Sequence, residues 1–279
     1  MVTLKAEHRL EVLLRIAGLA RSTFFYHQAR LQTPDPHLGL KADITQLFEH
    51  NKGRYGHRRV HVRLQKKGWR VARKTVLKLM NQLGLFCRVR RKRSYTSYRG
   101  QAGEVAPNLL ERDFTAQEPN QRWVTDVTEF RVGERKVYLS PVMDLFDRQI
   151  IAYTAGLSPN LELTNASLRA ALATLAPGQA PLVHSDQGFQ YQHVSWQRLL
   201  AGVGCVQSMS RKGNCLDNAV IESFFGHLKE EFFTHAEFHS FEVFTAELDE
   251  YIAWFNNERV HTYLEGLSPV QYRAQALAA

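Results

Sequence analysis

The sequence is poor in cysteine and contains no long apolar run. Its three cysteines, Cys87, Cys205 and Cys215, form no Cys-x-x-Cys pair, which argues against a disulfide framework and against a zinc ribbon. There is no stretch of about 18 apolar residues and no signal-peptide pattern at the start. We therefore expect a soluble, cytoplasmic protein without a membrane partner.

Acidic residues are scarce in the first part of the chain. Residues 1–110 hold 23 Lys and Arg against 6 Asp and Glu, a net charge of +17, whereas residues 111–279 carry a net charge of −8. A length of 279 residues is enough for two folded units. The asymmetry predicts that the first unit binds a polyanion, and its interleaved apolar and aromatic residues favour nucleic acid over a membrane surface.

The basic part is predicted to be helical. Residues 1–33 indicate a helical hairpin, because Leu10, Leu13 and Leu14 form one stripe that Gly18 ends. Residues 41–86 contain three apolar stripes at helical spacing, which predict a helix-turn-helix-like DNA-binding domain. The stripes are Ile44, Leu47 and Phe48; Val60 and Leu64; and Val76, Leu77, Met80 and Leu83.

Two groups of basic residues in this part are candidates for DNA contact. In a helix-turn-helix the start of the last helix enters the major groove, which here would present Arg73, Lys74, Thr75 and Lys78. A solvated basic helix that contacts no base is an equally good interpretation of each residue taken singly. Residues 87–117 are predicted to be a basic linker that follows a DNA backbone. Its candidate contacts are Arg90, Arg91, Lys92 and Arg93.

Residues 118–279 show a different, α/β pattern. Residues 123–130, 136–143 and 149–157 are predicted strands separated by turns, which favours an antiparallel meander. A helix over 161–175, a short buried strand at 181–184, a helix at 195–200 and a strand at 205–208 follow. The pattern predicts five strands with helices between the later ones.

Three acids in this part have unusual surroundings. Asp126 lies within an apolar strand pattern, Asp186 ends another, and Glu222, with 35 residues between it and Asp186, begins an amphipathic helix. Taken singly, each acid is better interpreted as a cap, a turn residue or half of a surface ion pair. Taken together they predict a cage of oxygen ligands for two Mg²⁺ or Mn²⁺ ions. Paired ions of this kind serve phosphoryl transfer.

The flanking motifs resemble a known family. They are Trp123-x-Thr125-Asp126-x-Thr128, His184-Ser185-Asp186-x-Gly188 with Tyr191, and Asn218-Ala219-x-x-Glu222-Ser223-Phe224-Phe225 followed by Lys229. The chain resembles the DDE transposases of two-reading-frame bacterial insertion sequences, as their second-frame catalytic product with a retroviral-integrase-like core. The resemblance implies a ribonuclease H-like fold with a mixed five-stranded sheet. In that fold Asp126 would lie on the first strand, Asp186 just after the fourth, and Glu222 on a helix.

The resemblance also implies residues and partners around the acids. Lys229, Arg211 and Lys212 would contact DNA, which comprises the insertion-sequence ends and the target. An upstream-frame protein, joined by frameshifting, would add DNA binding, and the protein would form a homo-oligomer on DNA in the bacterial nucleoid. We interpret Asp217 and Asn218 as helix-capping residues. We interpret Asp144 and Asp147 as strand-end and turn residues, with Asp144 a substitute ligand if a triad assignment fails.

We therefore expect a transposase that performs metal-dependent DNA cleavage and strand transfer without a covalent intermediate. One alternative is a DNA-binding repressor or architectural protein with an inactive core, which would be expected to lack a triad acid. Another is a ribonuclease H-like nuclease. The helix-turn-helix and the tail at Ser268-Pro269 argue against the nuclease, because cutting alone requires neither.

Overall fold

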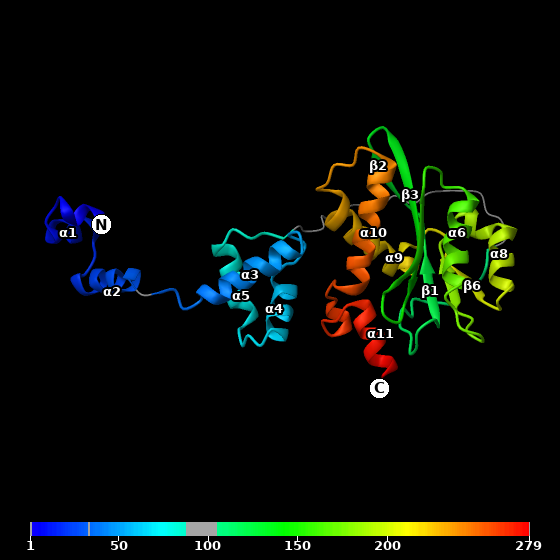
Figure 1. The fold of residues 1–279 in the computed structure, drawn as a ribbon, viewed down its shortest axis with the longest axis horizontal. Coiled ribbons are helices and arrows are strands. Elements are labelled where there is room, and N and C mark those ends of the chain that lie inside the picture. Colours follow the sequence, from blue (N-terminus) through cyan, green and yellow to red (C-terminus); the bar gives the residue numbers. More distant parts are fainter. Residues whose placement is uncertain (1, 33, 88–104, 279) are drawn as a thin grey trace. The chain divides into compact units, whose positions relative to one another are not determined.

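The computed structural model describes residues 2–32, 34–87 and 105–278. The chain divides into two compact units, Met1–Phe86 and Cys87–Ala279, and each is described by itself (Figure 1). The predicted DNA contacts Arg90, Arg91, Lys92 and Arg93 lie outside the described residues. None of the described helices is long and apolar enough to cross a membrane.

The first unit is helical, as its apolar stripes predict. Three of its helices pack together through buried residues that recur at helical spacing, such as Ile44, Val60 and Val76. Its helices are η1 (Thr3–Ala6), α1 (Leu10–Ala17), α2 (Arg21–Gln32), α3 (Leu38–His50), α4 (His57–Lys66) and α5 (Arg73–Gln82). Helices α3, α4 and α5 contact one another and form a three-helix core.

The turn between α4 and α5 is tightly built. Gly68 adopts a left-handed φ of 90°, which glycine accepts without steric cost. The backbone N–H of Trp69 donates to the Leu64 carbonyl at 3.0 Å. The Trp69 indole N–H donates to Asp43 on α3 at 2.6 Å. These bonds fix the path of the chain from α4 into α5.

The second unit is built on one mixed sheet in the order β2-β3-β1-β5-β6, with β4 pairing the other edge of β3. The strands β1, β5 and β6 run parallel, and the other pairs are antiparallel. The strands are β1 (Arg122–Thr125), β2 (Thr128–Val132), β3 (Arg135–Asp144), β4 (Ile150–Gly156), β5 (Leu182–Ser185) and β6 (Val206–Met209). The predicted α/β class with a mixed sheet is confirmed.

The predicted number of five strands is wrong for the described residues. The predicted strand 123–130 is two strands, β1 and β2, interrupted at Asp126 and Val127. Thr125 pairs with Val142 and Thr128 with Leu139, so the shared register places Asp126 opposite Pro141. Pro141 has no N–H for the ladder. The Val127 N–H instead donates to the Asp126 carboxylate at 2.7 Å, and the interruption leaves Asp126 just beyond β1 rather than on it.

Helices cover both faces of the sheet (Figure 1). On one face α6 and α8 pack with Trp123 and Val183, and on the other α9 and α10 pack with Val124 and Phe130. Trp123 and Val124 belong to different cores because successive strand residues face opposite sides. The helices are α6 (Leu161–Leu172), α7 (Phe189–Gln192), α8 (Val194–Ala201), η2 (Cys215–Asn218), α9 (Ala219–Leu228), η3 (Lys229–Phe233), α10 (Phe241–Asn257), η4 (Thr262–Leu264) and α11 (Pro269–Leu277).

Candidate active site

Asp126 and Asp186 lie at the same edge of the sheet. Asp126 directly follows β1, and Asp186 directly follows β5, its parallel neighbour. The register pairs Val124 with His184, and the same offset of sixty residues separates the two acids. Since parallel strands end at a common edge, both carboxylates are brought to one place. Asp186 thus follows the fifth strand of the observed order rather than the fourth.

The turn after Asp186 explains the glycine of the His184-Ser185-Asp186-x-Gly188 motif. The Gly188 N–H donates to Asp186 Oδ1 at 2.8 Å. A Cβ on Gly188 would lie 2.9 Å from that oxygen and 3.0 Å from Gln190 Oε1. Real Cβ atoms essentially never approach a neighbour under 3.0 Å, so any larger residue would displace the carboxylate. Gly188 is therefore part of the support of Asp186.

Glu222 reaches this edge from the first turn of α9. Ile221 and Phe225 on the same helix are buried against the sheet, which leaves Glu222 half-buried at the margin. Asn218, just before the helix, donates from Nδ2 to the Thr125 carbonyl at 3.3 Å. The start of α9 is thereby tied to the end of β1. Asn218 occupies the predicted N-cap position of α9 but makes no side-chain cap bond.

The electrostatics show that the three acids share one environment. Burial is the main reason that the pKa of Asp126 is raised well above its usual range. The charges of Asp186 and Glu222 raise this pKa further, whereas the Val127 N–H and the Lys229 charge lower it. Burial also raises the pKa of Asp186, against the bond from Gly188. Like charges that interact in this way must lie near one another. Negative charge is thus concentrated at this edge.

The buried phenol of Tyr191 lies behind the two aspartates. Its pKa is raised well above the usual value by burial, and then by the charges of Asp126 and Asp186. Its ring packs edge-on against Trp196, with centroids 4.9 Å apart. The two aspartates therefore have a buried aromatic side chain near them, and burial strengthens charge interactions at this edge.

The donor atoms suit a hard divalent cation. Asp126 and Asp186 each use Oδ1 for a backbone N–H and keep Oδ2 for another partner. Carboxylate oxygens are the preferred ligands of Mg²⁺ and Mn²⁺. As the side chains stand, however, no group of three or more His, Cys, Asp or Glu residues in the described parts of the chain is arranged to hold a metal ion.

Comparisons with known proteins agree with this architecture. Residues 37–93 match an HTH-like domain, and residues 116–215 and 222–277 match two integrase core domain families. The chain is 46% identical to the putative transposase InsK for insertion sequence element IS150 of Escherichia coli (strain K12), over 98% of this chain and 96% of that protein. The chain belongs to the insertion-sequence DDE transposases. The predicted family, transposition function and polynucleotidyl transferase activity are confirmed.

Two further relatives show how far the similarity extends. The transposase InsF for insertion sequence IS3A of Escherichia coli (strain K12) is 34% identical, over 98% of this chain and 97% of that protein. An uncharacterized transposase-like protein of Haemophilus influenzae (strain ATCC 51907 / DSM 11121 / KW20 / Rd) is 48% identical, over 75% of this chain and 95% of that protein. The matches with InsK and InsF span both units of the transposase.

Lys229 lies on the same side as the acids. It follows the last residue of α9 and opens a π-helical turn, η3, in which Lys229 O accepts from both N and Oγ1 of Thr234, at 2.8 and 2.7 Å. Its Nζ lies 5.6 Å from the centroid of the Phe130 ring on β2. Its charge lowers the pKa of Asp126. The regular α-helix that carries Glu222 therefore ends at Leu228, and a π-helical turn carries Lys229.

Asp217 has a different role from the predicted helix cap. It is fully buried and accepts from the Arg211 backbone N–H at 3.0 Å, from Arg211 Nε and Nη2 at 2.8 Å each, from Arg112 Nε at 2.8 Å, and from Asn108 Nδ2 at 3.0 Å. The Arg211 guanidinium, predicted to contact DNA, is therefore committed to Asp217. Lys212, its neighbour, is exposed. Asp217 anchors the loop that precedes the helix of Glu222.

Asp144 and Asp147 do not join the transposase acids. Arg273 on α11 donates to Asp144 Oδ2 from Nη2 at 2.7 Å and to Asp147 Oδ2 from Nε. Asp144 pairs with Trp123, three residues before Asp126, about 10 Å away along the strand. Burial raises the pKa of Asp144 to about 6, against bonds from the Phe146 and Asn120 N–H groups. Its use as a substitute ligand is therefore unsupported, and both acids instead attach the C-terminal helix.

His184 lies within the His184-Ser185-Asp186-x-Gly188 motif and has a structural role. Its Nδ1 lies 2.8 Å from Ser208 Oγ and its Nε2 3.0 Å from Ser210 Oγ, which links β5 to β6 and to the loop beyond. Burial lowers its pKa to about 4. The imidazole is therefore neutral at pH 7 and positions the strand that leads to Asp186.

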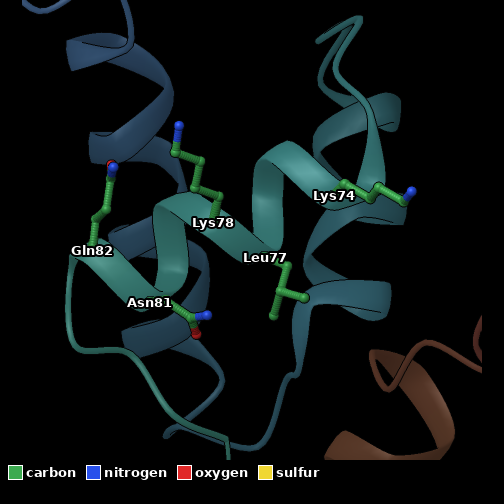
Figure 2. Close-up of a pocket in the computed structure, with 5 residues that line it drawn as sticks. All are labelled: Lys74, Leu77, Lys78, Asn81 and Gln82. Atoms are coloured by element: carbon green, nitrogen blue, oxygen red, sulfur yellow. The ribbon is translucent and has the colours of Figure 1, made fainter.

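The helix-turn-helix unit presents the other predicted contacts. Arg73, Lys74 and Lys78 are exposed on α5, and Thr75 is half-buried. Figure 2 shows an open hollow on this helix, lined by Lys74, Leu77, Lys78, Asn81 and Gln82. The sequence indicated the lysines. The predicted place of Leu77 in the buried apolar stripe is wrong, because this residue is 41% exposed. The sequence pattern does not single out Asn81.

Proposed function

We propose that Asp126, Asp186 and Glu222 are the catalytic acids of this transposase and that they hold two divalent cations, Mg²⁺ or Mn²⁺. When bound, such ions stabilise the attacking and leaving oxygens of an in-line displacement at phosphorus. Asp126 and Asp186 would hold both ions. Glu222 would complete one ion's shell by moving toward the aspartates from the first turn of α9.

One observation carries this proposal. In the described part of the core, each fully buried acid has an arginine partner: Asp144 and Asp147 pair with Arg273, Asp217 with Arg211 and Arg112, and Glu231 with Arg259. Asp126 and Asp186 are half-buried and, within the same described residues, have no arginine partner. Burial raises the pKa of both acids, and the Asp186 charge raises that of Asp126 further. A bound cation would offset both effects.

The surrounding residues would position the reaction. The N–H groups of Val127 and Gly188 hold one oxygen of each aspartate and so fix the direction of the other. Lys229 would place a phosphate of the DNA end on the side of the acids. A water or a DNA 3′-hydroxyl would attack the phosphodiester in line, and the leaving 3′-oxygen would depart on the opposite side, with no covalent enzyme intermediate.

The test uses labelled insertion-sequence end DNA, a target duplex and Mg²⁺ or Mn²⁺. Asp126→Asn, Asp186→Asn and Glu222→Gln should each lower the joining rate by about 10³-fold or more, which corresponds to about 4 kcal/mol of barrier. Binding of Mn²⁺, followed by calorimetry, should weaken in the same variants. Glu129→Gln is the matched control, because Glu129 is an exposed acid on β2. Wild-type joining by any triad variant would remove that residue from the active site.

The DNA contacts outside the core are also proposals. Arg73, Lys74 and Lys78 on α5 are supported by their exposure, and Lys212 by its exposed place in the loop before η2. Arg90 to Arg93 rest on the sequence alone. Arg211 is better regarded as the anchor of that loop, since Asp217 holds its guanidinium.

We further propose that an upstream-frame protein, joined by frameshifting, adds DNA binding and that the transposase works as a homo-oligomer on nucleoid DNA. This proposal rests on the family resemblance. End-specific joining by the lone chain and by the fused protein should differ, with the fusion the more specific. Equal specificity would exclude a recognition role for the fused part.

A further inference from the structure

Helix α5 has two sharply different faces. Val76, Leu79 and Met80 are buried, with at most 3% of each residue exposed. The opposite face exposes side chains at i, i+3, i+4 and i+7, together with one more at i+8. These residues are Lys74, Leu77, Lys78, Asn81 and Gln82, which also line the open hollow in Figure 2.

The exposed face is divided into two rows. In Figure 2, Leu77 and Asn81 leave the helix on one side, whereas Lys78 and Gln82 leave it on the other. Homeodomains, a helix-turn-helix variant, read the major groove with four recognition-helix positions of the same i, i+3, i+4, i+7 spacing. On α5 these positions are Lys74, Leu77, Lys78 and Asn81. The face thus combines cationic, apolar and amide chemistry at positions that can reach DNA together.

Two of these residues are poorly explained by the fold. Leu77 is 41% exposed and stands among polar side chains. Asn81 is exposed in the last turn of α5, where asparagine favours the helix less than lysine or glutamine would. One exposed leucine alone is common on protein surfaces. The two together supply the groups that recognise an A·T pair in the major groove: an amide for adenine and an apolar contact for the thymine methyl.

We propose that Asn81 and Leu77 are the base-reading residues of this transposase, Asn81 bonding the N6 and N7 edge of an adenine and Leu77 contacting the 5-methyl group of a thymine. Lys74 and Lys78 bind backbone phosphates and fix the register. This inference rests on the proposed role of α5 in binding the insertion-sequence ends. The sequence pattern predicts that the start of α5, at Arg73 to Thr75, enters the major groove. This inference instead assigns base recognition to the middle and end of the helix.

The test uses the full-length chain without divalent cation, so that binding is measured without chemistry. A preferred duplex is first selected from a random library by the wild type. Each adenine of that duplex is then replaced by 7-deazaadenine and each thymine by uracil, one position at a time. Affinities are measured for the wild type, Asn81→Ala, Leu77→Ala and Lys78→Ala. Gln65→Ala, an exposed amide on α4, is the matched control.

For the wild type, 7-deazaadenine at one position should weaken binding about tenfold, and uracil at one position about threefold. Asn81→Ala should abolish the loss of affinity caused by 7-deazaadenine, and Leu77→Ala should abolish the loss caused by uracil. Gln65→Ala should retain both losses. Lys78→Ala should weaken binding to all sequences and reduce the salt slope by about one. Retained binding to unselected DNA shows that the variants are folded.

Two outcomes would overturn the inference. If the wild type selects a site but every penalty persists in Asn81→Ala and Leu77→Ala, base reading lies elsewhere while the proposed function stands. If the wild type selects no sequence, α5 of this chain reads no base. The joining assay with triad variants decides the catalytic proposal independently, because it depends on the core.

Discussion

The parts of the transposase chain before and after residue 110 use charge in opposite ways. Residues 1–110 carry a net charge of +17, and in α5 the basic side chains are exposed over a wholly apolar buried face. Residues 111–279 carry a net charge of −8, and their notable acids point inward. A DNA-binding surface needs its charges in solvent, whereas a catalytic edge needs them partly desolvated and fixed. The difference separates DNA binding from chemistry within one chain.

The core repeats this contrast on a smaller scale. Its arginine-paired acids join distant segments: Glu231 receives two bonds of 2.8 Å from Arg259, and Asp144 and Asp147 hold Arg273 of the last helix. Asp126 and Asp186 have backbone N–H donors instead. Removing one member of a buried, paired set leaves its partner uncompensated and destabilises the fold, whereas the half-buried Asp126 and Asp186 leave a carboxylate oxygen for the cation that we propose. The arginine partner therefore distinguishes the structural acids from the proposed catalytic ones.

The largest effect is expected from breaking a structural acid. Asp217→Ala removes the acceptor of five hydrogen bonds. We expect a loss of about 3 kcal/mol in the free energy of unfolding, at the low end for a broken buried pair because both arginines can turn to solvent. Urea denaturation measures the loss. Asp113→Ala, which removes an exposed partner of Arg122, should cost less than about 1 kcal/mol. If both variants lost the same free energy of unfolding, the distinction between buried, arginine-paired acids and exposed acids would not hold.

Asp217 also shows where prediction from the sequence stops. The apolar stripes of α3 to α5 and the strand patterns around Asp126 and before Asp186 are local, so the presence of these elements and the confirmed fold class follow from them. The partners of Asp217 are 6 and 105 residues away, and Arg273 lies 129 residues from Asp144. The strand break at Asp126 depends on Pro141, which only the register brings opposite. Such contacts have no local signature.

The charge division is tested by separating the chain at residue 104, which leaves the core contacts of Asn108 and Leu110 intact. Residues 1–104, which hold the same net charge of +17, should bind duplex DNA at least about 100-fold more tightly than residues 105–279 at 50 mM salt, and this advantage should shrink steeply as salt rises. Fluorescence anisotropy over a salt series measures both. Comparable binding by the two fragments at moderate salt would show that the core contributes as much to DNA affinity as the basic unit does.

Lys229 and Lys212 are expected to affect different steps. Lys229 should position the DNA end for joining, and Lys212 should contribute to general DNA affinity. Lys229→Ala should slow joining about tenfold at saturating DNA, because the charge that opposes the repulsion at Asp126 and grips the end is lost. Lys212→Ala, in the exposed loop, should instead weaken DNA binding several-fold at an unchanged saturated rate. Joining rates and anisotropy on the same DNA distinguish them. An unchanged rate and end affinity in Lys229→Ala would assign that residue to the ordinary surface.

The smallest effect is expected from Asp126→Asn in the absence of a divalent cation. This substitution should stabilise the fold, whereas Asp217→Ala should destabilise it. Because the folded pKa of Asp126 is raised, the folded state holds its proton more tightly than the unfolded chain, whose Asp pKa is about 3.9. Stability contributed by this group is therefore greatest at low pH and falls as pH rises from about 3.9 through the folded pKa.

Asp126→Asn removes that penalty. In EDTA at pH 7 the variant should melt about 2–4 °C above the wild type, the shift that about 1 kcal/mol produces in a domain of this size. Near pH 3, where the wild-type carboxyl is protonated in both states, the difference should vanish. Added Mn²⁺ should raise the melting temperature of the wild type and not that of the variant. A variant that is less stable than the wild type at pH 7 in EDTA would show that Asp126 supports the fold as Asp217 does, and the two kinds of acid would no longer be distinct.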